Sequence, residues 1–284
     1  MTEALPIERP DLAEVGNFLH SNLNRRIAPQ DWVASLTHPW AAVPPNHGWQ
    51  LRDAGRLVGV FCAIYSDQWI DGRPEKFCNL HSWCVLPQYR SGGLALALSL
   101  LRQTGYHFTI YTPNATVAAL FQGLRFRRLD DRLVYVANLP TPWPRRGGRF
   151  VESEPARIAP RLHGTVLDEF RAHSGIAWLQ FVAFGQGDDV CLAVYKRGRW
   201  KRMPCAELLH LSNSGAMQRH GHLLRHFLLT RQGLPVCRIE GRFLEAAPSA
   251  SISLPRTLAK LVLSDSLADP SMSNLYTELV ALDL

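Results

Sequence analysis

The chain has 284 residues, of which 46% are hydrophobic and 19% charged, and its formal net charge is +7. This composition excludes a disordered chain, and the lack of any run of about 18 apolar residues excludes a membrane-spanning helix. At roughly 100–200 residues per domain the length favours two domains, and an acidic N-terminus without a secretory pattern predicts a cytoplasmic protein.

The positive charge comes from arginine, because only four of the 31 basic residues are lysine. These arginines are spread along the chain instead of forming blocks, which argues against a nucleic-acid-binding tail. An anionic cofactor or substrate explains the charge equally well. The six cysteines form no CxxC pair and lie in apolar runs, so we expect buried free thiols and neither a metal site nor a disulfide framework.

In the first half, the hydrophobic pattern predicts the order β-α-loop-β-β-β-loop-α-β-α-β. A strand at 5–8 leads into a helix at Asp11, where Asp11 and Glu14 form a capping box. The Pro- and Trp-rich stretch 37–49 cannot be regular helix. The other predicted elements of this half are strands 48–52, 57–65, 77–85, 107–111 and 132–136 and helices 94–104 and 115–124.

The second half repeats part of this pattern after a segment rich in Pro, Gly and Arg at 139–149, which we interpret as a linker. Gly93 and Gly105 are twelve residues apart and enclose the pair Leu100-Leu101. Gly221 and Gly233 are also twelve apart and enclose the pair Leu228-Leu229. The shared offset of 128 residues predicts a tandem repeat. The predicted second-half elements are helices 156–172 and 223–230 and strands 178–184, 190–195, 206–211 and 235–240.

The segment Cys84–Ala95 carries the most informative pattern, a strand followed by a sharp turn and a glycine-bearing loop that enters a helix. The first amide groups of such a helix have no partner within the helix and can bind an anion. Gly92 and Gly93 would let a ligand approach the backbone closely, and Arg90 would supply a fixed cation. The loop lacks both the Gly-Lys-Ser/Thr of a Walker motif and the GxGxxG of a dinucleotide site.

Arg90-x-x-Gly93-x-Ala95 resembles the acyl-CoA pyrophosphate loop of the GCN5-related N-acetyltransferase (GNAT) superfamily, Arg/Gln-x-x-Gly-x-Gly/Ala. The order of elements over 1–137 and the run Thr112-Pro113-Asn114 also resemble this family. The resemblance implies an α/β protein of two GNAT-like modules, each a mixed, mostly antiparallel twisted sheet flanked by helices. The predicted division is an acyl-CoA-binding domain at 1–138, a linker at 139–149 and a degenerate GNAT-like domain at 150–284.

The resemblance further implies transfer of an acetyl or other acyl group from acyl-CoA to a primary amine of a small molecule or peptide, by direct attack in a ternary complex. In this fold the fourth and fifth strands splay apart and the pantetheine arm lies between them. The backbone at Cys84 and Val85 would pair with that arm, and Asn114 would touch it. The residues expected to bind the pyrophosphate through their amides are Arg90, Ser91, Gly92, Gly93, Leu94 and Ala95.

The second module keeps only part of the loop pattern. Gln218-x-x-Gly221 is present, but Leu223 stands where a small residue is needed. We therefore expect a GNAT-like fold without a CoA site. It would either form a wall of the acceptor cleft or only stabilise the first module or a dimer, so both a monomer and a homodimer remain open.

His81 is the candidate base for an amine acceptor. Strand alternation predicts Phe77, Asn79, His81 and Trp83 on one face, and in arylalkylamine acetyltransferases, a branch of this family, a histidine on the same strand serves as base. An imidazole has a suitable pKa for that work. The alternative is a buried histidine bonded to a backbone group.

The general acid is less well defined. The family often uses a tyrosine of the fourth helix, but Phe121 stands at that position, which leaves Tyr89, Tyr111 or a water molecule. Cys84 could act as a nucleophile, although its place on a strand favours packing. Two other functions remain open: a non-catalytic acyl-CoA-binding regulator, and a Fem-like transferase that uses aminoacyl-tRNA.

Overall fold

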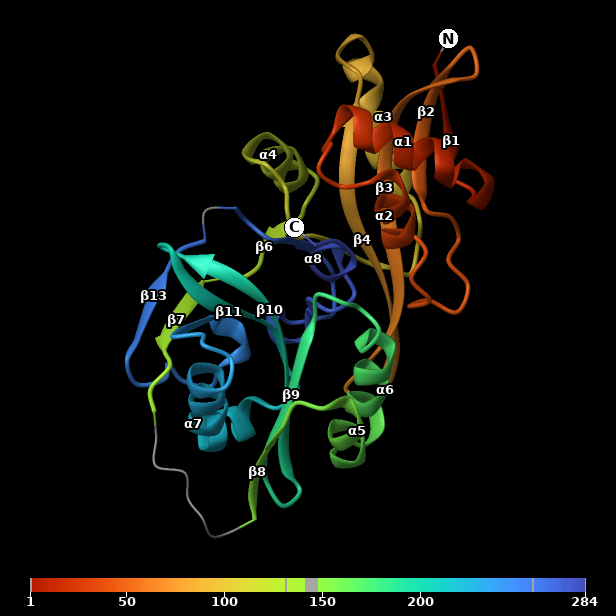
Figure 1. The fold of residues 1–284 in the computed structure, drawn as a ribbon. Coiled ribbons are helices and arrows are strands. Elements are labelled where there is room, and N and C mark those ends of the chain that lie inside the picture. Colours follow the sequence, from red (N-terminus) through yellow and green to blue (C-terminus); the bar gives the residue numbers. More distant parts are fainter. Residues whose placement is uncertain (1, 131, 141–147, 257, 284) are drawn as a thin grey trace. The chain divides into compact units, whose positions relative to one another are not determined.

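The computed structural model describes residues 2–130, 132–140, 148–256 and 258–283, and within them no helix is both long and apolar enough to span a bilayer. The chain forms two compact units. Unit 1 is drawn from Met1–Leu129, Leu258–Leu267 and Tyr276–Leu284, and unit 2 from Asp130–Thr257 and Ala268–Leu275. Each unit contains one seven-stranded, mostly antiparallel sheet with helices on its faces, as the resemblance implied (Figure 1).

The sheet of unit 1 has the strand order β1-β2-β3-β4-β5-β14-β6. Among the strand pairs that the described residues form in this sheet, β4 with β5 is parallel and the others are antiparallel. The strands are β1 (Thr2–Pro6), β2 (Gly48–Asp53), β3 (Arg56–Ile70), β4 (Arg73–Val85), β5 (His107–Ile110), β14 (Leu261–Leu263) and β6 (Arg127–Arg128). The helices are α1 (Leu12–Asn22), α2 (Pro29–Ser35), α3 (Gly93–Leu101), α4 (Ala115–Gly123) and α8 (Glu278–Ala281), and the 3-10 turns are η1 (Arg9–Asp11) and η2 (Pro87–Gly92).

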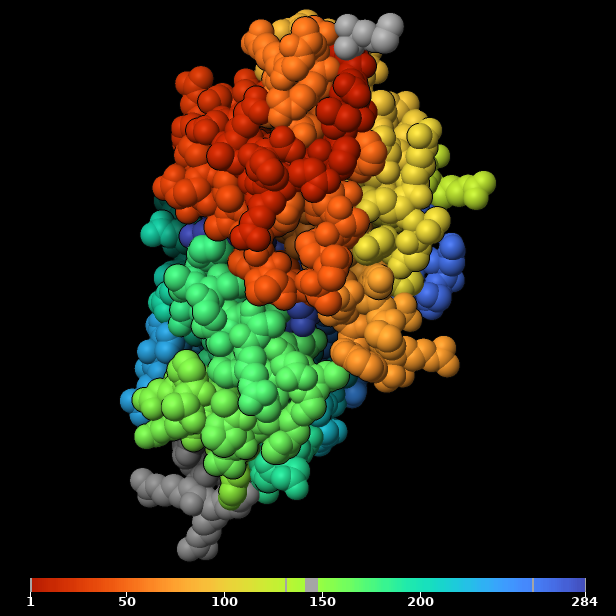
Figure 2. Space-filling view, turned by 90° about the vertical axis from the view of Figure 1, so that its right-hand side faces the viewer, coloured from red at the N-terminus to blue at the C-terminus, as the bar shows by residue number. Residues whose placement is uncertain are grey.

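Strand β3 is buried without interruption from Leu57 to Ser66, because helices cover both faces of the sheet. Apolar side chains of α1 and α2 pack on one face, against Val60, Cys62 and Cys84. The side chains of α3 and α4 pack on the other face, against Phe61 and other residues of β3 to β5. In Figure 2 the red residues of α1 and α2 and the yellow residues near position 100 lie on different sides of this unit. Burial of these two layers is the main driving force for the unit.

The sheet of unit 2 has the order β13-β7-β12-β11-β10-β9-β8. Of the pairs seen in the described part of this unit, β11 with β12 is parallel and the others are antiparallel. The strands are β13 (Ser251–Leu254), β7 (Leu133–Ala137), β12 (Val236–Glu240), β11 (Met203–Leu211), β10 (Asp189–Trp200), β9 (Gln180–Gln186) and β8 (Arg149–Glu152). The helices are α5 (Pro155–Ile158), α6 (Gly164–His173) and α7 (Ser214–Thr230), with 3-10 turns η3 (Ala159–Arg161), η4 (Gly241–Phe243) and η5 (Asp269–Ser271). Side chains of α7 form the centre of the apolar core.

The units differ from the division predicted from the sequence at both ends. Strand β7, expected to complete the first module, pairs with β12 over five residues and belongs to unit 2. Val134 and Val136 join the core beneath α7, while Tyr135 stacks on Trp200 on the other face. In unit 1, the position expected for β7 is taken by β14, which pairs with β5 and β6. Alternation marks a strand but does not tell which sheet it joins.

Other predictions are corrected locally. The expected helix at 156–172 is broken into α5, η3 and α6, because Pro160 lies inside it and cannot donate to a helical hydrogen bond. Helix α7 begins nine residues before the predicted position, at Ser214, where the Asn213 side chain accepts from the Ala216 N–H. All six cysteines are buried free thiols, as predicted. Most of the proposed linker, 141–147, lies outside the described residues.

Candidate active site

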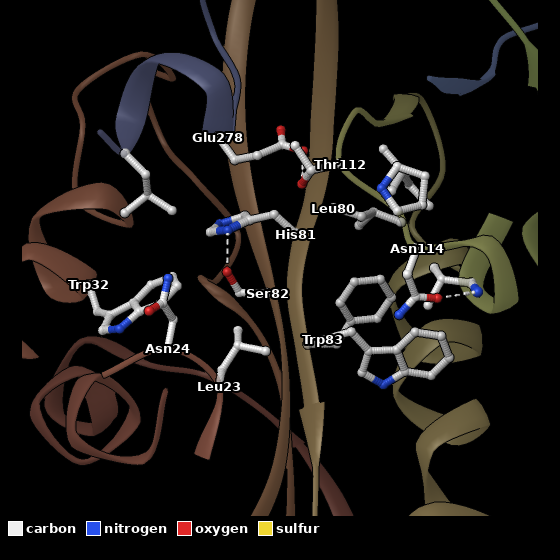
Figure 3. A pocket seen from close by; sticks show the side chains of 15 residues that line it. Leu23, Asn24, Trp32, Leu80, His81, Ser82, Trp83, Thr112, Asn114 and Glu278 are labelled. Atoms are coloured by element: carbon white, nitrogen blue, oxygen red, sulfur yellow. Dashed lines mark hydrogen bonds between the residues drawn. The ribbon is translucent and has the colours of Figure 1, made fainter. Parts of the chain in front are cut away.

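A cavity of about 330 Å³ opens in unit 1 where β4 and β5 separate (Figure 3). The two strands pair only from Phe77↔His107 to Asn79↔Thr109, and β4 then continues alone to Val85. Such a volume suits a small-molecule site. The cavity is lined by four groups of residues: the α1–α2 segment (Leu23, Asn24, Trp32), β3 and β4 (Phe61, Leu80, His81, Ser82, Trp83), the region from β5 to α4 (Ile110, Thr112, Pro113, Asn114, Val117) and the C-terminal segment (Glu278, Leu282).

A β-bulge at Ser82 decides which side chains of β4 face the cavity. Val60 is paired with Cys84 and Cys62 with His81, so two residues of β4 stand opposite one of β3. Ser82 adopts a φ of 54°, which is rare for a residue with a side chain. A bulge shifts the alternation by one residue. The expectation that Trp83 shares a face with His81 is therefore wrong, and Trp83 instead stacks on Phe61, with ring centroids 4.8 Å apart.

His81 lines the cavity with one ring nitrogen available. Its Nδ1 lies 2.8 Å from the Ser82 hydroxyl, whereas Nε2 is buried and has no hydrogen-bond partner in the described part of the chain. Burial lowers the pKa of His81 to about 3, so the imidazole is neutral near pH 7. In Figure 3 the ring points to the side of β4 where Trp32 and Asn24 lie.

Glu278 is the titratable group of this cavity that the sequence analysis missed. Its side chain is fully buried, and Oε1 accepts hydrogen bonds from the Tyr111 N–H (3.1 Å) and the Thr112 hydroxyl (2.9 Å). Oε2 has no partner among the described residues. Burial raises the pKa of this carboxyl, although the bond from Thr112 and the charge of Lys260 oppose the shift. The sequence offered only a weak signal, one acidic residue within an apolar run.

The predicted pyrophosphate loop is a 3-10 turn, η2, that continues directly into α3. The Gly93 N–H donates to the Arg90 carbonyl, so this amide is engaged within the turn. Gly92 faces the core, where a Cβ atom would lie 2.8 Å from Leu51 Cδ2. Arg90, Ser91, Leu94 and Ala95 have exposed side chains at this end of the helix. The two glycines thus serve packing and turn geometry, and the exposed residues form the surface on which an anion could bind.

The remaining predicted site residues lie around the separation of the strands. Val85 packs with the α3 and α4 side of the core, and Cys84 with the α1 and α2 side. Burial raises the pKa of the Cys84 thiol, which favours packing over nucleophilic attack. Asn114 lines the cavity while its Oδ1 accepts from the Val117 N–H as the N-cap of α4.

None of the described residues that line the cavity is a tyrosine. Phe121, at the position where the family often has its acid, is fully buried and packs against Phe61, Trp83 and Phe126. The Tyr89 hydroxyl donates to Asp53 at 3.0 Å, away from the cavity. A proton for the leaving group would therefore come from another side chain of the cavity or from water.

Comparison with solved structures shows the fold over most of the chain. A GCN5-related N-acetyltransferase from Anabaena variabilis matches with a TM-score of 0.60 and 10% identity, over 92% of this chain and 72% of that one. A GCN5-related N-acetyltransferase from Kribbella flavida matches with a TM-score of 0.59 and 14% identity, over 92% and 71%. Eis1 from Mycobacterium abscessus matches with a TM-score of 0.54 and 12% identity, over 92% and 73%.

The chain therefore has the fold of the GNAT superfamily, as the sequence resemblance implied. No protein-family model and no curated protein sequence matches it. At this level of identity the likeness defines the fold, and the chemistry has to be argued from the cavity itself.

Proposed function

We propose that unit 1 transfers an acyl group from acyl-CoA to a primary amine of a small molecule or peptide. The observation that carries this proposal is the cavity at the separation of β4 and β5, in which the His81 Nε2 and Glu278 Oε2 atoms are buried without partners among the described residues. Buried polar atoms of a folded protein are almost always hydrogen-bonded. The Nε1 atoms of Trp32 and Trp83 are two more exceptions in the same lining, and together the four atoms suggest that a ligand supplies the missing partners.

The shape of the site suits an extended acyl thioester. In the described part of the chain, the edge of β4 from Leu80 to Val85 has no neighbouring strand on the β5 side, so its backbone groups can pair with an amide-containing arm. At the far end of this edge, Arg90 and the start of the helical segment η2–α3 provide positive charge for a pyrophosphate. Ser91, Leu94 and Ala95 are exposed beside it.

In the reaction, the amine nitrogen attacks the thioester carbonyl carbon, the new C–N bond forms and the C–S bond breaks. The amine must lose a proton and the departing thiolate must gain one. Burial lowers the pKa of His81 and raises that of Glu278, so a proton released in the cavity is held better by the carboxylate than by the imidazole. We assign to His81 Nε2 the hydrogen bond that orients the amine, and to Glu278 the acceptance of its proton.

A second candidate function is acyl-CoA binding without catalysis. The observation that favours it is Phe121, a buried phenylalanine at the position of the family's usual acid. Binding accompanied by no release of thiol, with acetyl- and longer acyl-CoAs and a panel of primary amines, would favour this function over the transferase.

The cofactor is tested by thermal unfolding with acetyl-CoA. A ligand that binds only the folded state adds about 2.7 kcal/mol at a concentration 100 times its Kd, so Tm should rise. Ala95→Asp should abolish this rise, because Ala95 is exposed at the start of α3 and the added carboxylate would repel a pyrophosphate. Gly175→Asp, at a position with open space around it, is the control. No rise in Tm with any acyl-CoA would contradict the proposal.

A further inference from the structure

The β4–β5 ladder ends abruptly, and the residue at its end comes from the C-terminal segment. The last paired residues are Asn79 and Thr109. The next N–H after β5, that of Tyr111, donates to Glu278 Oε1 at 3.1 Å instead of to a strand. Thr112 donates its hydroxyl to the same oxygen at 2.9 Å.

Glu278 is tied to β4 as well. Its own N–H donates to Asn79 Oδ1 at 3.0 Å, and Asn79 Nδ2 donates to the Thr109 hydroxyl at 3.0 Å. The backbone of Glu278 is thus fixed to the last paired residue of one strand, and its carboxylate to the first residues beyond the other. Figure 3 shows the side chain reaching across to Thr112.

We propose that Glu278 is a positioning residue that ends the β4–β5 ladder and holds the acyl-binding cleft open. An unsatisfied Tyr111 N–H in this buried place would be costly, so without the carboxylate it would seek a carbonyl acceptor. The unpaired edge of β4 offers such carbonyls nearby. Closing that gap would fill the space that a thioester needs. This inference rests on the proposed function only for its binding readout, and it concerns a role of Glu278 other than proton acceptance.

The experiment compares Glu278→Gln with Glu278→Ala. The glutamine keeps a carbonyl oxygen that can accept from Tyr111 and Thr112, so the Kd for acetyl-CoA should stay within about twofold of the native value. The alanine removes the acceptor, and the Kd should rise about tenfold or more. Thr112→Val, which removes one of the two donors, should have an intermediate effect. The control is Glu75→Ala. Glu75 is an acid of β4 that contacts His107 outside the cavity, so its removal should leave the Kd for acetyl-CoA unchanged.

Amide hydrogen exchange of the ligand-free proteins gives a second readout that does not depend on acyl-CoA. In Glu278→Ala, the peptide covering Leu80–Val85 should exchange more slowly than in the native protein, because its open edge becomes paired. Unchanged exchange and Kd in the alanine variant would overturn the inference, and so would a glutamine variant as weak as the alanine variant. If the native protein binds no acyl-CoA, the proposed function fails, and the exchange comparison still decides this inference.

Discussion

The two sheets have the same strand arrangement, but the gap beside their parallel pair is filled by side chains in unit 2 and open in unit 1. In each, the fourth and fifth strands pair over only three residues, Phe77–Asn79 in unit 1 and Cys205–Glu207 in unit 2. In unit 2, Asn274 enters beyond that point and donates to the Leu209 carbonyl at 2.9 Å. In unit 1 the corresponding gap remains a cavity.

The groups that fill unit 2 satisfy one another. Arg242 donates to Glu240 at 2.8 Å and to the Asn274 side chain at 2.9 Å, and further to the carbonyls of Asp269 and Met272. The unit 1 cavity instead leaves one nitrogen of His81 and one oxygen of Glu278 without partners in the described residues. The comparison teaches that this fold creates a gap by geometry, and that the side chains inside it decide whether the gap becomes core or site.

The largest effect is expected from removing Arg242, the cation of the hydrogen-bond network that fills the gap of unit 2. Arg242→Ala should lower the free energy of unfolding by about 3–5 kcal/mol, because it leaves the buried Glu240 carboxylate without its main partner. Denaturant unfolding measures this. Arg171→Ala, which removes an exposed ion pair at 3.8 Å, is the control. Equal stability of the two variants would mean that the network does not hold this region together.

A smaller effect is expected in the open gap of unit 1. His81→Ala should lower kcat about 100-fold, because the amine loses the group that orients it, while the Kd for acyl-CoA changes less than about twofold. The rate of thiol release at saturating substrates measures kcat, and equilibrium binding measures the Kd for acyl-CoA. His163→Ala, an exposed histidine of unit 2, serves as the control. A native kcat in His81→Ala would reject the role of His81.

The smallest effect concerns stability against acid. Since burial lowers the pKa of His81 from 6.5 to about 3, the unfolded chain binds a proton below pH 6.5 that the folded chain does not. The free energy of unfolding should therefore fall as the pH decreases from 6.5 to 5, by about 1.4 kcal/mol per pH unit for this group. His81→Gln should remove that part of the slope. An unchanged slope would mean that His81 is not held neutral in the fold.

Much of the fold could be predicted because its signals are local. Alternation located β3 and β4, and the turn at Asp71-Gly72 joins them. The placement of His81 in the cavity was also accessible, since it depends only on its strand. These features are set by neighbours within a few residues.

The features that the sequence did not predict depend on residues far apart in the chain or on the backbone conformation of a single residue. The bulge at Ser82 follows from no residue type that marks a bulge, yet it moves Trp83 to the other face of the sheet. Glu278 is 199 positions away from Asn79, which binds its backbone. The sequence also does not indicate that β7 joins the sheet of unit 2 and β14 the sheet of unit 1. Both are short apolar strands that could pair with either sheet.

Strand β14 also constrains how a nascent chain can fold. Synthesis proceeds from the N-terminus, so β5 and β6 leave the ribosome about 150 and about 130 residues before Leu261–Leu263, the strand that must lie between them. Until then β5 lacks its neighbour on one side and β6 lacks the strand with which it pairs, and the cavity lacks Glu278. All strands of unit 2 have emerged by that time. The intervening unit can therefore assemble first, and the site-bearing unit closes around its last-made segment.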